Sequence, residues 1–77
     1  MIEFPSRKTI HRLRRQYPVG TRVRLVSMDD KYRAMPAGLR GTVYMVDDMG
    51  TIHIDWDNGS MLGAVYGVDE IEKVVSE

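Results

Sequence analysis

The sequence predicts a mainly β fold in which one N-terminal helix precedes five short strands. Apolar residues repeat at helical spacing as far as residue 17 and alternate with a period of two after residue 20. Glycine-containing turn signals separate the alternating segments. The 77 residues suffice for one domain with a single hydrophobic core, expected over residues 1–77.

A basic amphipathic helix is expected over residues 5–17. Ser6 is suited to be its N-cap, because a serine hydroxyl accepts a hydrogen bond from a backbone amide that the first turn leaves free. Ile10, Leu13 and Tyr17 form one narrow apolar stripe. A proline directly after this stripe ends the helix, since proline has no backbone N–H to donate.

Five strands are expected beyond the helix, at residues 23–28, 42–46, 51–57, 60–66 and 72–75. The connection over residues 29–38 is long and irregular and is the expected binding loop. Asn58-Gly59 predicts a type I′ hairpin turn, in which both central residues have positive φ. A long loop, tight hairpins and a closing strand are typical of a five-stranded SH3-like barrel, expected over residues 20–76.

The type I′ turn determines which side chains share a face of the expected hairpin. It pairs Ile52 with Val65 and places Trp56 on the core face. The opposite face then carries six side chains: His53, Asp55, Asp57, Leu62, Ala64 and Tyr66.

Three structural alternatives remain open for this second face. The helix stripe docks on it and brings Arg12 and Arg15 near Asp55, a partner covers it, or the hairpin has a different register. Docking agrees with the charge pattern, because residues 1–24 carry a net charge of +6 and residues 25–77 a net charge of −6. Such asymmetry indicates either an intramolecular contact or a charged partner.

The number of arginines near the N-terminus indicates nucleic acid as one possible charged partner. The candidate phosphate contacts are Arg7, Lys8, Arg12, Arg14, Arg15, Arg22 and Arg24. No helix-turn-helix or zinc finger accompanies them, so binding of this kind is expected to tolerate any sequence and to weaken with salt. The zero net charge of the whole chain argues against long-range attraction to a polyanion.

The residues argue against an enzyme. Cysteine is absent, which excludes a thiol nucleophile and disulfides. His53 and Asp55 point the same way along one strand, but two ligands are too few for a zinc site. We therefore expect a noncatalytic protein without metal or cofactor. Because no apolar run approaches membrane-spanning length, a cytoplasmic location is expected.

Five ordered segments carry a resemblance to a known family: Tyr17–Leu25, Met28–Asp30, Pro36–Val43, Val46–His53 and Trp56–Ser60. Over residues 17–75 the chain resembles the bacterial and phage proteins grouped as domain of unknown function 4314. The resemblance implies a small SH3-like barrel and no established activity. The central hairpins are also similar, more weakly, to the mind-bomb/HERC-type barrel used for protein recognition. The basic helix lies outside these shared motifs.

The leading hypothesis is a small interaction module, an accessory protein of phage or mobile-element type, that binds a protein partner. The loop over residues 29–38 and an aromatic surface are its expected contact region. The candidate contact residues are Tyr32, Arg33, Met35, Leu62 and Tyr66. Sequence-tolerant nucleic-acid binding through the helix is the second hypothesis. Sequestration of a small molecule or nucleotide is the third. The oligomeric state stays open.

Overall fold

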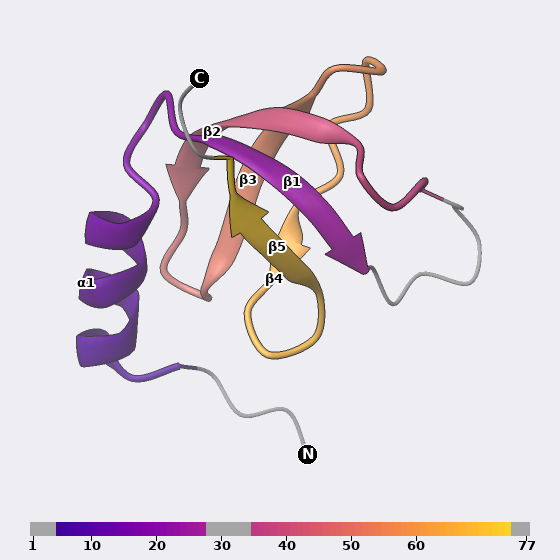
Figure 1. The fold of residues 1–77 in the computed structure, drawn as a ribbon. Coiled ribbons are helices and arrows are strands. Elements are labelled where there is room, and N and C mark those ends of the chain that lie inside the picture. The colour runs from indigo at the N-terminus through magenta and orange to yellow at the C-terminus, as the bar shows by residue number, and fades with distance from the viewer. Residues whose placement is uncertain (1–4, 28–34, 75–77) are drawn as a thin grey trace.

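The computed structural model describes residues 5–27 and 35–74, and it confirms the mainly β fold (Figure 1). One helix, α1 (Arg7–Gln16), precedes the strands. The strands are β1 (Arg22–Ser27), β2 (Arg40–Val46), β3 (Thr51–Trp56), β4 (Ala64–Val65) and β5 (Glu70–Lys73). They form one antiparallel sheet in the order β4-β3-β2-β1-β5, and over the described residues hydrogen bonds do not close this sheet into a barrel.

Helix α1 begins and ends as the sequence predicts. The Ser6 hydroxyl accepts a hydrogen bond of 3.2 Å from the Thr9 amide, which caps the first turn. The Tyr17 amide donates to the Leu13 carbonyl over 2.8 Å and completes the last turn. Ile10, Leu13 and Tyr17 are all buried, so the predicted apolar stripe is the face that the helix turns toward the sheet.

The core lies between α1 and the concave side of the sheet. Leu13 and Tyr17 of the helix join one cluster of buried strand residues. The strand members of this cluster are Val23, Leu25, Val43, Val46, Ile52, Ile54, Trp56 and Ala64. The helix therefore docks on the core face of the sheet, with its backbone beside β2. The prediction that it docks beside Asp55 is wrong, because the side chains that alternate with the core residues point away from the helix.

The hairpin between β3 and β4 has a different register from the expected one. Ile52 pairs with Ala64, one residue earlier than the predicted partner Val65. The reason is the turn. Of Asn58 and Gly59, only Gly59 has positive φ, at 87°, and the Trp56 amide donates to the Ser60 carbonyl over 3.0 Å. The loop therefore has three residues, with a type I turn followed by a glycine bulge, and the predicted two-residue type I′ turn is wrong.

This shift of one residue exchanges the two faces of β4, because successive side chains of a strand point to opposite sides. Ala64 is buried in the core, whereas Val65 is exposed. Regular pairing on β4 is limited to two residues, where the sequence predicted a strand over residues 60–66.

A bulge in β2 settles which of its side chains face the core. Val43 pairs with Ile54, but the next pair is Met45 with His53, so one extra residue lies between them. Val43 and Val46 are consequently both buried, although three positions separate them. Tyr44, at the bulge, is exposed on the outer face.

Candidate functional site

A groove of about 340 Å³ lies between α1 and the chain that follows β4. Leu13, Ile52 and Ala64 give it an apolar base that is continuous with the core. Its rims are Gln16 on the helix and the turn over residues 66–69. A mostly apolar concavity with a few polar groups at its rim is the usual form of a ligand site.

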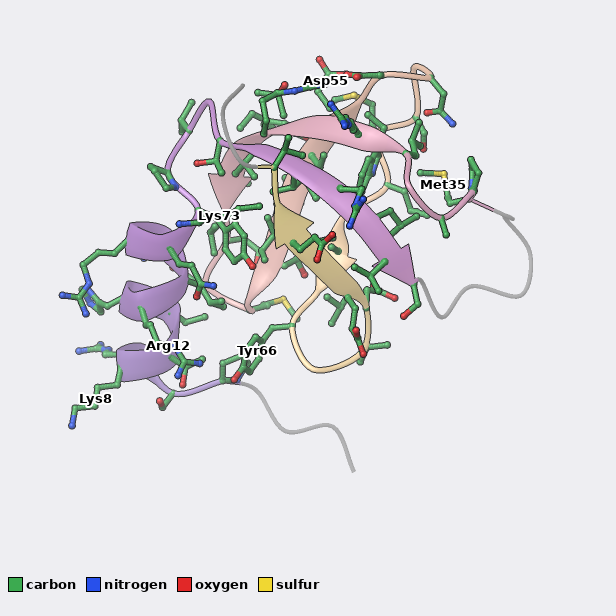
Figure 2. The ribbon with its side chains drawn as sticks, in the orientation of Figure 1. Lys8, Arg12, Met35, Asp55, Tyr66 and Lys73 are labelled. Carbon is green, nitrogen blue, oxygen red and sulfur yellow. The ribbon has the colours of Figure 1, made fainter. Side chains whose placement is uncertain are left out.

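Tyr66 forms one wall of the groove and is held from two sides. The Arg12 guanidinium donates a hydrogen bond of 2.9 Å to its hydroxyl and lies 5.8 Å from the centre of its ring (Figure 2). The Tyr66 amide donates to the Gly50 carbonyl over 3.2 Å. These contacts order the side chain while 43% of its surface remains exposed.

Exposed apolar side chains extend the groove onto the surface. Val65, Val68 and Met49 are 40%, 54% and 56% exposed. The hydrogen bond from Tyr66 to Gly50 brings the turn that carries Met49 beside them. We call these three residues and Tyr66 the apolar patch. Adjacent exposed apolar residues of this kind mark contact surfaces for other proteins.

The free edge of β4 is closed to strand addition. The Val65 amide, which points away from β3, donates to the Asp69 carboxylate over 2.9 Å. The Val65 carbonyl accepts from the Asp69 amide over the same distance. Since both backbone groups are satisfied within the chain, a ligand gains no main-chain ladder here and must bind through side chains.

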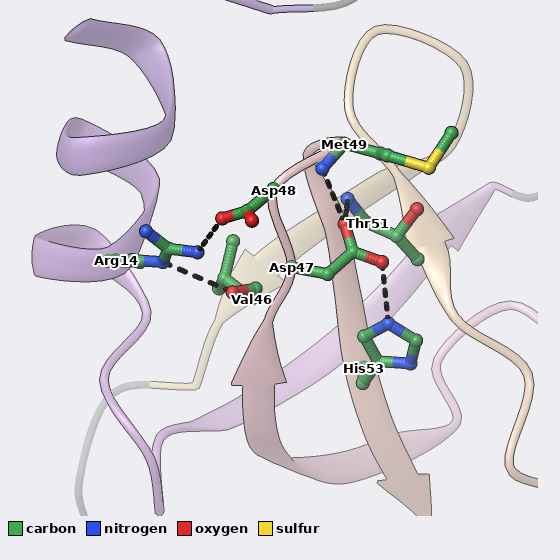
Figure 3. Close-up of polar contacts among 7 residues, drawn as sticks. All are labelled: Arg14, Val46, Asp47, Asp48, Met49, Thr51 and His53. Atoms are coloured by element: carbon green, nitrogen blue, oxygen red, sulfur yellow. Dashed lines mark hydrogen bonds and ion pairs between the residues drawn. The ribbon is translucent and has the colours of Figure 1, made fainter. Parts of the chain in front are cut away.

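Asp47 braces the turn between β2 and β3 (Figure 3). Its Oδ1 accepts from the amides of Met49 and Thr51, each over 2.9 Å, and its Oδ2 lies 2.9 Å from His53 Nε2. Burial raises the pKa of the Asp47 carboxyl, but the hydrogen bonds from His53 and the two amides outweigh it and leave the pKa below its ordinary value. His53 thus contacts Asp47 of the adjoining turn.

Arg14 ties the helix to the same turn. Its Nη2 lies 2.7 Å from the Asp48 carboxylate, and its Nε donates to the Val46 carbonyl over 3.1 Å. The adjacent carboxylates Asp47 and Asp48 therefore point to different partners (Figure 3). They do not converge on one pocket, as paired catalytic carboxyls do.

The predicted phosphate-binding cations separate into two groups. Arg14, Arg22 and Arg24 each form an ion pair with a carboxylate of the chain, namely Asp48, Asp57 and Glu72. The Arg22 pair is bidentate, with distances of 2.9 and 2.6 Å, and its hydrogen bonds lower the pKa of Asp57.

The second group lies on the outward side of α1. Lys8, Arg12 and Arg15 surround a shallow depression together with Ser6 and Thr9. These cations and Arg7 form no ion pair within the described residues.

The predicted protein-contact residues do not form one surface where they are described. Met35 packs against the core and Tyr66 lies beside the helix, at the other end of the molecule (Figure 2). Leu62 is half-buried, and its carbonyl accepts from the Trp56 indole over 2.7 Å. Tyr32 and Arg33 lie outside the described residues.

Sequence reasoning identified Tyr66 but missed Val68 and Gln16, which line the same groove. The signal for Val68 was an apolar residue directly after Gly67, in a turn where it has no strand neighbour to cover it. No comparable signal marks Gln16, because its place at the groove depends on how the helix docks.

Within the described residues, no group of three or more His, Asp or Glu side chains is arranged to hold a metal ion. In the same part of the chain, no helix has the length and apolar character needed to cross a membrane.

Comparison with known proteins identifies a family. Residues 6–74 match the family described as Domain of unknown function (DUF4314). The match includes α1, so the expectation that the basic helix lies outside the shared motifs is wrong. No curated protein and no solved structure matches the chain. Since the family match covers nearly the whole chain, this protein belongs to the DUF4314 family, as its ordered motifs indicate.

Proposed function

We propose that this protein is a noncatalytic interaction module that binds a partner protein in the groove between α1 and residues 64–71. One observation carries the proposal. An apolar groove opens directly onto the apolar patch, and both are built on side chains that the fold already holds in place. Preformed apolar pockets beside an ordered aromatic side chain are typical anchor sites in protein interfaces.

The proposed occupant is an extended segment of the partner that inserts one large apolar side chain. The groove volume of about 340 Å³ suits a side chain with its adjoining backbone, and is too small for a helix. Val65 and Val68 cover the segment from one side. Arg12 and Lys73, which lie over the rings of Tyr66 and Tyr17, provide cations near the groove for polar groups of the segment.

Its proposed setting is the cytoplasm of bacteria or of phage-infected cells, as an accessory protein. The absence of cysteine and the family membership support this setting.

Selection from a display library of random dodecapeptides tests the proposal. Selected peptides are expected to share one large apolar residue and to shift the amide resonances of residues 64–71 in NMR titrations. Tyr66→Ala and Val68→Ser are expected to weaken binding at least tenfold, because each removes part of the groove.

Met61→Ser is the matched control. Met61 is 57% exposed, as apolar as the patch residues, and does not line the groove. Peptides that bind Tyr66→Ala and wild type equally, or that shift resonances elsewhere, would contradict the groove as the binding site.

A further inference from the structure

The outward side of α1 carries three cations in a regular row. Lys8, Arg12 and Arg15 are spaced i, i+4 and i+7, which brings them to one face opposite the buried stripe of Ile10 and Leu13. At 1.5 Å per residue, the row extends about 10 Å along the helix axis. All three side chains are exposed, and in Figure 2 Lys8 points away from the sheet.

The fold pairs Arg14, Arg22 and Arg24 with carboxylates and leaves this row, like Arg7, without an ion pair in the described part of the chain. Arg14, Arg22 and Arg24 already have carboxylate partners, and Arg40 makes a contact of its own. None of the three cations of the row forms an ion pair within the described residues, and α1 contains no acidic residue. The ion pairs therefore divide the seven candidate cations into a structural set (Arg14, Arg22 and Arg24) and an available set (Arg7, Lys8, Arg12 and Arg15).

The composition of this face favours a polyanion over a protein. A protein interface is anchored by apolar side chains that become buried. No large apolar residue of α1 is exposed, so the face offers an acidic protein no anchor. Evenly spaced cations match evenly spaced phosphates, and arginine can bind a phosphate with two parallel hydrogen bonds.

We propose that the row of Lys8, Arg12 and Arg15 is a second binding surface that contacts the phosphodiester backbone of nucleic acid without reading its sequence, and that it meets the groove only at Arg12, which holds Tyr66. Arg12 keeps free donors for this contact, because its guanidinium has five N–H groups and the Tyr66 hydroxyl takes one. The inference does not rest on the groove or on any peptide partner.

The proposal predicts how steeply the binding constant falls with salt concentration. A protein that neutralises three phosphates of duplex DNA releases counterions, so the logarithm of its binding constant falls against the logarithm of salt with a slope of about −2.7. Affinity should then drop about 40-fold between 50 and 200 mM NaCl. Fluorescence anisotropy of a labelled 20-bp duplex of mixed sequence, titrated at several salt concentrations, measures this slope.

Two single variants test whether binding depends on the row itself or only on the total positive charge of the protein. Arg15→Gln should reduce the slope by about 0.9 in magnitude, because one phosphate contact is lost. Arg22→Gln removes the same charge from the outer face of the sheet and should leave the slope unchanged. Both positions are exposed, and thermal unfolding followed by circular dichroism confirms that each variant is folded.

Three results would overturn the proposal. The first is no binding by wild type at 25 mM NaCl, and the second is an equal effect of Arg15→Gln and Arg22→Gln. The third is equal or tighter binding of poly-glutamate of matched charge, which would assign the row to an acidic protein. Equal affinity for two duplexes of unrelated sequence is the expected result, since a backbone contact carries no base information.

Discussion

The two hairpin turns at either end of β3 have the same backbone and very different surroundings. In the turn over residues 47–50, the Gly50 amide bonds to the Asp47 carbonyl over 3.2 Å. In the turn over residues 56–59, the Gly59 amide bonds to the Trp56 carbonyl over 2.9 Å. Both glycines have positive φ, 84° and 87°, and complete a type I turn with a glycine bulge.

The difference lies in what packs against each turn. Gly50 is buried, and a Cβ placed on it would lie 2.6 Å from Cγ of Pro5 and 3.6 Å from Cδ1 of Ile10. A Cβ on Gly59 would meet nothing within 4 Å. The same local rule therefore shapes both turns, whereas only the glycine of the first turn is packed against another part of the chain. The same turn also carries Met49, a member of the apolar patch.

The largest expected effect is that of Gly50→Ala. An alanine with positive φ costs about 1–2 kcal/mol, and overpacking against Pro5 adds about 1–3 kcal/mol. Gly59→Ala is the matched control and should lose only the first of these contributions. Urea unfolding of both variants measures the difference. Equal losses of unfolding free energy in the two variants would show that packing of residue 50 against Pro5 does not affect stability.

Next in size is the loss expected for Asp47→Ala. This carboxylate accepts from two backbone amides and contacts His53, so its removal should cost about 2–3 kcal/mol. At the other turn, the Asn58 side chain accepts from a single amide, that of Ser60, over 3.0 Å, and Asn58→Ala should cost about 0.5–1 kcal/mol. Urea unfolding at pH 7 compares the two, and a reversed order would contradict the comparison.

A smaller effect concerns acid, because each turn has an aspartate whose pKa is lowered below the ordinary 3.8. For Asp47, burial opposes the shift and hydrogen bonds from His53 and the amides prevail; for Asp57, the hydrogen bond from Arg22 is the main cause. A depressed carboxyl pKa contributes stability above the unfolded pKa and loses it as pH falls through the folded pKa. Unfolding free energy should therefore decrease below about pH 4.

High salt distinguishes the contributions of Asp47 and Asp57 to this pH dependence of stability. Asp57 is exposed, so 0.5 M NaCl should screen its pair with Arg22, whereas the hydrogen bonds of Asp47 depend little on salt. In high salt, Asp47→Asn should thus reduce the loss of unfolding free energy as pH falls. Asp57→Asn should reduce this loss only in low salt. Identical salt responses of the two variants would argue against this assignment.

Most of the fold could be predicted because its determinants are local. Ser6 and the stripe of Ile10, Leu13 and Tyr17 predict the helix through capping and period, and the helix is there. Alternation in β3 predicts that Ile52, Ile54 and Trp56 are buried, and they are. The mainly β class follows from such segments alone.

What could not be predicted depends on one turn and on distant contacts. Asn58-Gly59 fits a two-residue turn as well as the end of a three-residue loop, and the choice shifts β4 by one residue. The sequence of the other turn, Asp47 to Gly50, has the same length with glycine last, and could have indicated the longer loop. The groove depends on how α1 docks, which no local pattern encodes.

The smallest effect is expected where the helix is tied to the first turn by charge. Arg14 and Asp48 are 45% and 94% exposed at their side chains, and exposed ion pairs contribute about 0.2–1 kcal/mol. Arg14→Gln should cost about 1 kcal/mol in urea unfolding, since it also removes the hydrogen bond to the Val46 carbonyl. Arg15→Gln, one residue along the helix without an ion-pair partner in the described chain, should change stability by less than about 0.5 kcal/mol.

The Arg14 result also tests what attaches the helix. If Ile10, Leu13 and Tyr17 hold α1 by burial, the loss in Arg14→Gln stays near 1 kcal/mol and shrinks in 0.5 M NaCl. A loss above about 3 kcal/mol would mean that the helix depends on this clamp. The turn over residues 47–50 would then be held mainly by its ion pair with the helix. Electrostatics, more than packing, would account for the difference between the two turns.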